Sequence, residues 1–498
     1  MRSLALLALA LVAAPAWADG AARPLPLRGA IDQAVRNSPA LGMSRADYAA
    51  AEGALLAAQG LDDPLVDAAG TFVETHQPVT SPQQPGTVDD LQLGVGLTQP
   101  LPTGGRIGLR FATEYSRGLV LSTPSGVTTP PVANPTGGPT QLWLPSLQLT
   151  FSHSLLRGFG IGIARAQQRK ARIGVEAAGS ARGATAAALL RDVVAGYWEL
   201  YYAQHQRAVR RAAADAAREQ LEIVKANIAV GKQPPSASAE VEVVIANRET
   251  DVLVAEQELL ERAVELARLM GSEVDEGATL LRASDEPAAA TRVPPLDGVL
   301  QVALQGNLDL LTVRANLRSA GVDADVAANA RLPQLDVAAS GGPSGAAVNA
   351  ATAFGQLATF SGYTAQGSFV FQQPTLNRAA RGNYLTARAA VRKADLDEVL
   401  VRQQVRASAV RLVAAAENAA RRLSMLAPST DAANRDLEAE RARFTVGRST
   451  NFDVLRRQDE VAQVRLRQLR ARVDYEQAIA SVDTLTGEIL PRLGVTLR

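Results

Sequence analysis

The chain has 498 residues, of which 47% are hydrophobic and 20% are charged; this balance can build a buried core and excludes a disordered chain. Its formal net charge of +1 gives no electrostatic reason for a nucleic acid partner. The absence of cysteine excludes a disulfide framework, a thiolate metal site, a cysteine nucleophile and a lipid-bearing N-terminal cysteine.

Residues 1–18 have the three parts of a secretion signal. Arg2 supplies the positive start, 4–14 the apolar stretch and Ala16-Trp17-Ala18 a small-x-small cleavage site. Cleavage after Ala18 would export the protein; a buried N-terminal helix is the alternative. No later segment has eighteen continuous apolar residues, so the sequence predicts no transmembrane helix, and entry into a membrane would need strands.

Two similar halves follow this leader. The segment 27–41 resembles the segment 296–310 at an offset of 269 residues, whereas later positions match at an offset of 216. The smaller second offset places extra chain in the first half. The pairs that share the second offset include Ala171/Ala387, Val230/Val446, Gly231/Gly447 and Gly271/Gly487.

The repeat sets the expected domain boundaries. We expect a first repeat over 19–271, a linker over 272–295 and a second repeat over 296–498. Each repeat has short helices, then alternating strands, then a pair of long helices. The long helix pairs are expected at 165–271 and 379–487, and the second-repeat strands at about 334–372.

The extra chain of the first half contains an added hairpin. The runs "LQLGVGLTQ" and "RIGLRFATEY", at about 91–116, are joined by "PLPTGGR" and flanked by loop-like stretches at 76–90 and 122–141. Alternating apolar and polar residues also mark strands at 147–152 and 363–372. This pattern is typical of a sheet packed on a soluble core and equally of a membrane barrel, so it leaves both open.

The long helices distinguish the chain from a compact globular protein. The segment from about 165 to 230 lacks proline and is rich in helix formers, and about 65 residues make roughly 100 Å of helix. Apolar residues then recur every seven positions, which indicates coiled-coil packing. These residues are Ile245, Val252, Leu259 and Leu266 in the first half, and Val454, Val461, Tyr475 and Val482 in the second, where Gln468 interrupts the series.

The number of strands points to an oligomer. One chain offers about four strands, or six with the added hairpin, whereas the smallest closed membrane barrels have about eight. An open sheet cannot lie in lipid with unpaired edges. If the strands enter a membrane, several chains must therefore share one barrel in a symmetric ring.

Taken together, these features resemble the TolC-type outer membrane efflux proteins over almost the whole mature chain. The local matches are "SLLRGFG" at 154–160, "VGRSTNFDVL" at 446–455 and "VDTLTG" at 482–487. The resemblance implies a mainly α fold in which antiparallel coiled-coil helix pairs form a periplasmic tunnel, joined to a twelve-stranded β-barrel shared by a homotrimer. The missing cysteine places the chain with the non-lipidated members.

The resemblance also implies a function. It predicts a passive exit duct in outer-membrane lipid, docked to a periplasmic adaptor (a membrane fusion protein) and an inner-membrane pump of RND, ABC or MFS type. It predicts no enzymatic activity and no cofactor, and it leaves the exported substrate open. The alternative is a secreted coiled-coil stalk without a pore. The added hairpin either joins the barrel or lies outside it.

Two helix turns are the first candidate sites. Gly231 and Gly447 suit the left-handed position that ends a helix, and Pro234 and Pro235 suit the start of the next helix. From residues alone these are ordinary helix-hairpin turns. The resemblance implies that they form the periplasmic mouth and contact adaptor tips. The candidate contact residues are Val230, Gly231, Lys232, Val446, Gly447 and Arg448.

Asp453 is the second candidate, because the resemblance places an inward-facing aspartate near the constriction. Three copies would form an acidic ring that favours cations. Arg456 stands three residues later, so the two side chains can pair and neutralise the ring, as an ordinary solvated pair would. Phe444, just before the turn, is either a gate residue or a packing residue.

The remaining residues predict no chemistry. The three histidines are not spaced as metal ligands, and no nucleophile–base arrangement or complete phosphate-binding loop occurs. The aromatic run Tyr197, Trp198, Tyr201 and Tyr202 is expected to pack one face of a helix bundle, with a ligand box as the alternative.

Overall fold

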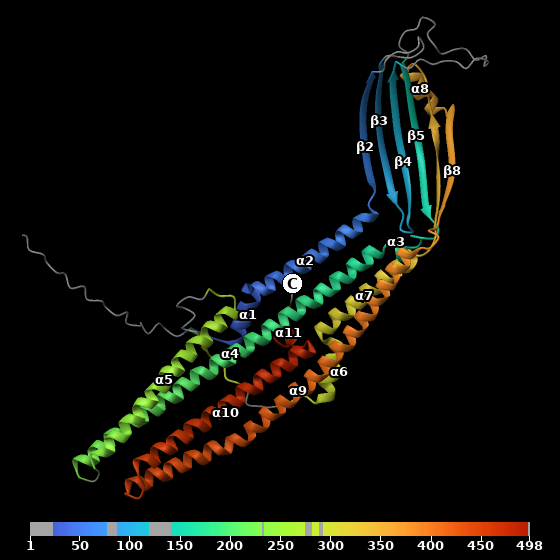
Figure 1. Ribbon diagram of the computed structural model, residues 1–498. Helices are drawn as coiled ribbons and strands as arrows, with labels where there is room; N and C mark the ends of the chain where they lie inside the picture. The colour runs from blue at the N-terminus through green and yellow to red at the C-terminus, as the bar shows by residue number, and fades with distance from the viewer. Residues whose placement is uncertain are drawn as a thin grey trace, which may run out of the picture. The chain divides into compact units, whose positions relative to one another are not determined.

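The computed structural model describes residues 23–76, 87–118, 141–231, 234–273, 281–287 and 292–496. They form two compact units (Figure 1). The helical unit contains the described residues of 1–47, 179–312 and 399–498, and the sheet unit contains those of 48–178 and 313–398. The expected secretion signal at 1–18 and parts of the expected linker lie outside the described residues.

The helical unit is built mainly from long helices. Helices wholly within it are α1 (Leu27–Asn37), α5 (Ser236–Leu269), α6 (Leu296–Gly306), α10 (Asn451–Thr486) and α11 (Ile489–Arg492). Helices with residues in both units are α2 (Pro39–Gln59), α4 (Ala166–Ala229), α7 (Leu308–Asn329) and α9 (Arg378–Thr445). The short strands β1 (Arg23–Leu25) and β6 (Leu281–Ala283) pair in parallel.

The two longest helices differ in one respect. Helix α4 runs for 64 residues without proline, where the sequence predicts a long helix from about 165. Helix α9 runs for 68 residues and contains Pro428 in its interior. At the repeat offset of 216 residues, the α4 residue that matches Pro428 is Ala212. The backbone of α9 therefore lacks one hydrogen-bond donor that α4 has at the matching place.

The aromatic run packs as expected into the core of the helical unit. Tyr197, Trp198 and Tyr201 are buried and meet edge to face, with ring centroids 5.2 and 5.8 Å apart. The Tyr197 hydroxyl donates to the carbonyl of Leu25 at 3.0 Å and accepts from the amide of Asp285 at 2.9 Å. The core thereby joins α4 to the short parallel sheet, and burial raises the pKa of Tyr197.

The seven-residue spacing also marks buried positions. Leu259 and Leu266 on α5, and Val461 and Val482 on α10, are all buried. Exposed positions of α10 include the charged residues Arg456, Asp459 and Arg465, as in solvated coiled-coil helices. The prediction of coiled-coil helix pairs is therefore confirmed for the helical unit.

The sheet unit holds one six-stranded antiparallel sheet in the order β2-β3-β4-β5-β7-β8. Its strands are β2 (Leu65–His76), β3 (Thr87–Pro100), β4 (Gly105–Arg117), β5 (Gln141–Ser154), β7 (Gln334–Ser344) and β8 (Gly362–Gln372). The short helices of this unit are η1 (Gly60–Asp62), α3 (Ile161–Ala164) and α8 (Ala350–Ala358). Helix α8 was not predicted; Asn349 caps it by accepting a hydrogen bond from the amide of Ala351 at 2.8 Å.

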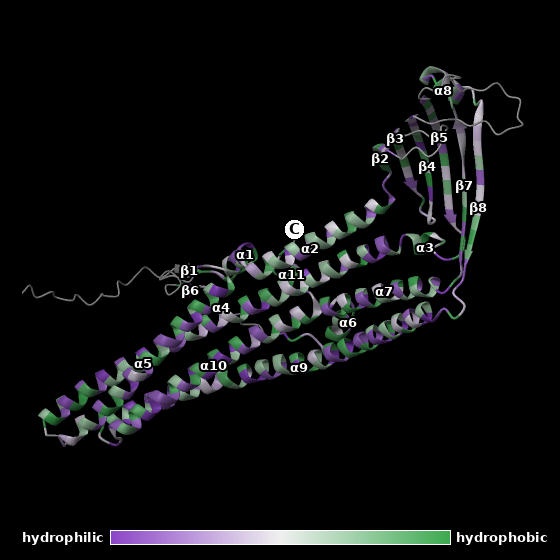
Figure 2. Cartoon of the chain, turned by 45° about the horizontal axis from the view of Figure 1, so that its top comes forward, coloured by the Kyte–Doolittle hydropathy of each residue, from purple (hydrophilic) through white to green (hydrophobic). Residues whose placement is uncertain are grey.

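The register separates an apolar from a polar face of this sheet. Phe151 is paired with Ile107, and Leu149 with Leu109 and Gly341, so the apolar side chains of neighbouring strands share one face. Much of that face is exposed: Leu149 on β5 is 51% exposed and Phe369 on β8 is 77% exposed. The hydropathy colouring shows the alternation along the strands (Figure 2).

The chain is mainly helical with one large sheet, as the sequence predicts. Among the described residues the sheet ends at two edge strands, β2 and β8. No helix in the described part of the chain combines the length and the apolar character needed to cross a membrane.

Candidate functional site

Two hairpin tips, one in each helix pair, contain the candidate contact residues. The first tip follows α4 and contains Val230 and Gly231; the second follows α9 and contains Val446, Gly447 and Arg448. Both views place the tips side by side (Figures 1 and 2). Since both tips belong to the helical unit, this proximity is a property of one compact body.

Each tip turns at a glycine with left-handed backbone. Gly231 and Gly447 both have φ of 74°, which confirms the expected helix-ending conformation. At the second tip the Gly447 amide donates to the carbonyl of Phe444 at 3.0 Å, and the Arg448 amide donates to that of Arg443 at 2.9 Å. These two bonds form a Schellman motif, which satisfies carbonyls that the end of α9 leaves free.

The tips present apolar side chains to their surroundings. Val230 is 68% exposed and Val446 is 67% exposed, and they occupy matching positions of the two repeats. Arg448 is exposed beside them, whereas Lys232 lies outside the residues whose side chains are described. Each glycine turn therefore has an exposed valine directly before it.

Asp453 lies in the first turn of α10 and caps that helix. The Thr450 hydroxyl donates to the Asp453 carboxylate at 2.6 Å, and the Thr450 amide donates to it at 3.2 Å. The Asp453 amide in turn donates to the Thr450 hydroxyl at 3.3 Å, which completes a capping box. The hydrogen bonds from Thr450 are the main reason that the pKa of Asp453 lies below its usual value.

The expected pair between Asp453 and Arg456 takes a weaker form than the spacing suggests. Among the described residues, the hydrogen-bond partner of the carboxylate is Thr450, and Arg456 lowers the Asp453 pKa only as a nearby positive charge. Arg456 is exposed, and Phe444 is half-buried next to the turn. The capping box prevails because its donors lie within one helical turn and need no extended side chain.

Arg248, a buried residue with partners on two other helices, was not predicted from the sequence. Arg248 lies on α5 and is only 6% exposed. Its guanidinium donates to the carbonyl of Ala213 on α4 at 2.7 Å. It also reaches α10, donating to the carbonyl of Leu455 at 3.1 Å and to the carboxylate of Asp459 at 2.8 Å. One buried cation therefore ties three helices together.

A sequence signal for Arg248 was available. It lies three residues after Ile245 and four before Val252, in the apolar seam of α5. A charged residue in such a seam specifies register or partner at a cost in stability. A second buried polar contact lies nearby, where the Gln220 side chain donates to that of Asn451 at 2.8 Å and joins α4 to the start of α10.

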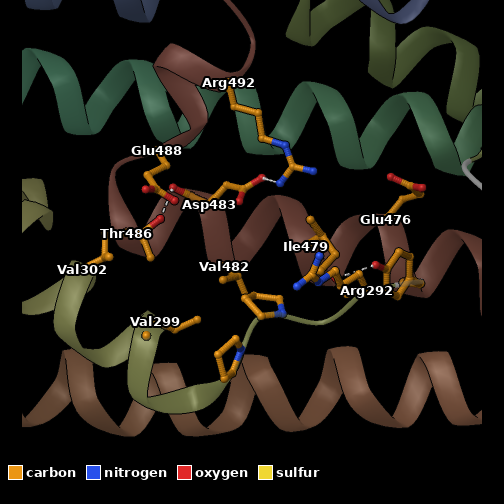
Figure 3. Close-up of a pocket in the computed structure, with 14 residues that line it drawn as sticks. Arg292, Val299, Val302, Glu476, Ile479, Val482, Asp483, Thr486, Glu488 and Arg492 are labelled. Atoms are coloured by element: carbon orange, nitrogen blue, oxygen red, sulfur yellow. Dashed lines mark hydrogen bonds and ion pairs between the residues drawn. The ribbon is translucent and has the colours of Figure 1, made fainter. Parts of the chain in front are cut away.

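A pocket of about 490 Å³ lies between α6, α10 and α11 (Figure 3). Its lining includes the apolar side chains of Val299 and Ile479 and the charged side chains of Asp483, Glu488 and Arg492. Asp483 forms an ion pair with Arg492, and the Tyr475 hydroxyl donates to the carbonyl of Arg292 at 3.2 Å. Burial is the main cause that raises the pKa of Asp483. The ion pair between Asp483 and Arg492 attaches α11 to α10.

Within the part of the chain that the structure describes, no three His, Cys, Asp or Glu side chains are grouped so that they could hold a metal ion. His153 contacts the hydroxyl of Thr103 at 2.8 Å, and His205 contacts the carbonyl of Tyr201 at 2.9 Å. These histidines bind neighbouring polar groups of their own units.

Similar proteins share this architecture. VceC of Vibrio cholerae, an outer membrane protein, is 17% identical; the match covers 93% of this chain and 96% of that chain with a TM-score of 0.64. The CmeC outer membrane channel of Campylobacter jejuni is 14% identical, with 96% and 91% covered and a TM-score of 0.64. The MtrE outer membrane channel of Neisseria gonorrhoeae, solved in its open state, is 15% identical, with 93% and 89% covered and a TM-score of 0.63.

At these identities the structural matches show a common fold. No curated protein sequence matches the chain. The model of the outer membrane efflux protein family matches residues 143–272 and 299–488, which together are more than half of the chain. The chain therefore belongs to the outer membrane efflux protein family.

Proposed function

We propose that three copies of this chain form a channel in the bacterial outer membrane, a passive exit duct that docks to a periplasmic adaptor and an inner-membrane transporter. The observation that carries this proposal is the two-faced sheet. Large apolar side chains such as Phe369 and Leu149 stand exposed on one face. Within the described part of the chain, the edge strands β2 and β8 each have a paired strand on one side only. Lipid would cover the apolar face, and neighbouring copies would pair the edges.

The hairpin tips support the docking part of the proposal. Val230 and Val446 are exposed at the turns, and Gly231 and Gly447 fix the backbone beside them. In a ring of three copies, six such tips would surround one opening. An adaptor with apolar tip residues could then pack between them. We assign Val230, Gly231, Lys232, Val446, Gly447 and Arg448 to this contact.

Asp453, Arg456 and Phe444 are proposed to line the opening. Three Asp453 carboxylates around an axis would attract cations and repel anions. The capping bonds from Thr450 lower the pKa of Asp453, so the carboxylates would stay ionised at neutral pH. Arg456 would reduce the negative potential of the three Asp453 carboxylates without cancelling it.

Opening of the duct would move the second helix pair away from the first. Arg248 would resist this movement, because it binds Ala213 on α4 and also Leu455 and Asp459 on α10. The energy would come from the pump.

Single-channel recording in a planar bilayer tests this function. Discrete conductance steps from the detergent-extracted protein would support a pore, and an Asp453→Ala variant should shift permeability toward anions. Glu261→Ala is the control, because Glu261 is exposed on α5, far along the chain from the tips. Equal shifts in ion permeability in both variants would show that Asp453 does not line the opening.

The alternative function, a secreted coiled-coil stalk without a pore, predicts a different result. A stalk would give no conductance, even from a variant whose tips are forced apart by Gly447→Glu, and it would not need detergent for extraction. Conductance steps together with recovery in the outer-membrane fraction would exclude it.

The domain organisation forms part of the same proposal. The family match falls in two segments, one in each expected repeat, which supports a two-repeat chain. Export would require removal of residues 1–18. Edman sequencing of the protein from the membrane fraction should therefore begin at Asp19.

A further inference from the structure

The added hairpin of the first half lies inside the sheet. Strand β3 pairs with β2 from Thr87 to Thr98, and β4 pairs with β5 from Gly105 to Arg117. Strands β3 and β4 also pair with each other along their length. The hairpin therefore separates β2 from β5, and each of its strands has hydrogen-bonded neighbours on both sides.

An ion pair crosses β3 and ties the hairpin to β2. Asp67 on β2 and Arg110 on β4 are both paired with Gly96 on β3, and Arg110 Nη1 lies 3.0 Å from Asp67 Oδ2. A Cβ atom at Gly96 would lie 2.4 Å from Asp67 Oδ1, and one at Gly94 would lie 3.0 Å from the Arg110 guanidinium. The two glycines thus leave the space that the ion pair occupies.

Two further contacts tie the hairpin to β5. Thr103, in the turn between β3 and β4, contacts His153 Nε2 at 2.8 Å. At the other end of the strands, the rings of Tyr115 and Trp143 lie 4.8 Å apart. The hairpin is thus fastened by side chains at both ends as well as by backbone bonds.

The hairpin also continues the exposed apolar face. Val95 on β3 is paired with Phe111 on β4, which is paired with Leu147 on β5, so these side chains share a face with the apolar residues of β5. Leu93, Val95 and Leu97 are each about half exposed. The hairpin therefore offers the same apolar surface as the rest of the sheet, and lipid would contact all six strands alike.

The two edges of the sheet fit a second copy of the same chain. Six strands in antiparallel order make β2 and β8 antiparallel to each other, so β8 of one copy can pair with β2 of the next without breaking the alternation. Their lengths are similar, at 12 and 11 residues. A ring of identical copies can then close with no free edge.

We infer that each chain contributes six strands, so that the trimer closes an eighteen-stranded sheet instead of the twelve-stranded one that the family resemblance implies. This inference rests on the proposed function for the number of copies. The family match begins at residue 143, so β2, β3 and β4 all lie outside it.

The consequence is a wider exit. With strands about 4.8 Å apart and tilted by about 40°, eighteen strands give a diameter of about 36 Å and twelve give about 24 Å. The cross-section would more than double. Closed sheets of sixteen to eighteen strands leave an open aqueous channel, so the exit would not limit passage of bulky cargo.

Electron cryomicroscopy of the detergent-extracted protein, viewed along the ring axis, tests the inference directly. We expect a ring of eighteen strands in a particle with the mass of three chains. The matched variant deletes residues 87–118, after which β2 and β5 can pair directly, because β2 ends and β5 begins at the same end of the sheet. Its ring should be about two thirds as wide.

Other outcomes overturn the inference. A twelve-stranded ring in a particle of three chains would show that β3 and β4 lie outside the closed sheet. A twelve-stranded ring in a particle of two chains would show that the protein is not a trimer. A wild-type ring no wider than that of the deletion variant would also contradict it. If the deletion variant does not assemble, the strand count of the wild type decides alone.

Conductance of the same preparation separates this inference from the proposed function. Conductance steps with a twelve-stranded ring would retain the channel and reject only the strand number. Because the chain has no cysteine, Gly70→Cys together with Gly367→Cys, on β2 and β8, supplies a second readout. Oxidation should link neighbouring copies into covalent trimers, and only monomers would contradict the proposed edge contact.

Discussion

The two helix pairs share a plan but differ in their polar contacts. Each pair turns at a glycine with φ of 74° beside an exposed valine. The first pair carries the buried Arg248 where the second has Val464, and the second carries Pro428 where the first has Ala212. The two turns thus share a backbone conformation although the helices beside them differ in sequence. The two pairs are joined by polar bonds from Arg248 on α5 to Leu455 and Asp459 on α10.

Exchanging the proline between the long helices should have the largest effect. Ala212→Pro should lower the free energy of unfolding by about 3 kcal/mol, because it removes a backbone donor from α4 and crowds the preceding turn. Pro428→Ala should raise it by about 1 to 3 kcal/mol. Denaturant unfolding of the extracted protein, at one fixed protein concentration, measures both.

One result of the proline exchange would contradict this expectation. If Pro428→Ala leaves the free energy of unfolding unchanged or lowers it, the missing backbone hydrogen bond at Pro428 does not destabilise α9. Ala214→Pro would not be a fair control, because Ala214 is buried, whereas Ala212 is exposed. Ala212→Gly is the better control, and its cost should be close to 1 kcal/mol.

Removing Arg248 should have the next largest effect. Arg248→Met keeps the aliphatic stem but removes the charged donor to Asp459 and to the carbonyls of Ala213 and Leu455, so unfolding should become easier by about 2 to 3 kcal/mol. If Arg248 holds α10 to the first pair, open channels should also become more frequent in bilayer recordings.

Arg210→Met is the matched control for Arg248. Arg210 pairs with Asp251 at 3.0 Å on the surface of the same two helices, so its loss should cost at most about 1 kcal/mol. Equal effects of the two substitutions on channel opening would show that Arg248 has no special part in holding the helices.

The two glycine turns should lose the same stability when their glycine is replaced by alanine. Equal losses would support the similarity of the two helix pairs. Gly231→Ala and Gly447→Ala should each cost about 1 kcal/mol, because the left-handed backbone disfavours a side chain. An added Cβ would meet nothing within 4 Å at either turn, so no further cost from clashes with other residues should follow. A much larger loss at one turn would mean that only that turn is packed in the assembled protein.

The smallest expected effect concerns the pKa of Asp453. Thr450→Ala removes the hydroxyl that donates to the carboxylate, so the pKa should rise toward its ordinary value of 3.8. In the wild type the pKa of Asp453 is lower in the folded state than in the unfolded state. The capping box therefore stabilises the fold at pH values above the unfolded-state pKa of Asp453. This stabilisation is lost as the pH falls through the folded-state pKa. NMR titration of the carboxyl carbon measures the shift.

Arg457→Ala is the control for this titration. Arg457 also lies near Asp453, but it acts on the carboxylate only through charge and pairs with Glu460 at 2.8 Å. Its removal should raise the Asp453 pKa less than the loss of the Thr450 hydroxyl does. The reverse order would assign the lowered pKa to charge.

Several features of this protein followed from the sequence alone, because their causes are local. Freedom from proline and strong helix formers predict the long helix α4, apolar residues seven apart predict helix packing, and Gly231 and Gly447 predict the turns. The capping box was also readable, since Thr450 and Asp453 have the spacing of that motif, but the nearby Arg456 suggested a different partner.

Only the tertiary structure decided features that join distant residues. The alternation of apolar and polar residues in a strand indicates which side chains share a face, but not which strand lies beside it. The position of β3 and β4 between β2 and β5 was therefore known only from the strand pairing in the structure. The partners of Arg248 lie on α4 and α10, more than 200 residues away for α10. Burial of such a cation depends on three helices meeting, and no local pattern sets that.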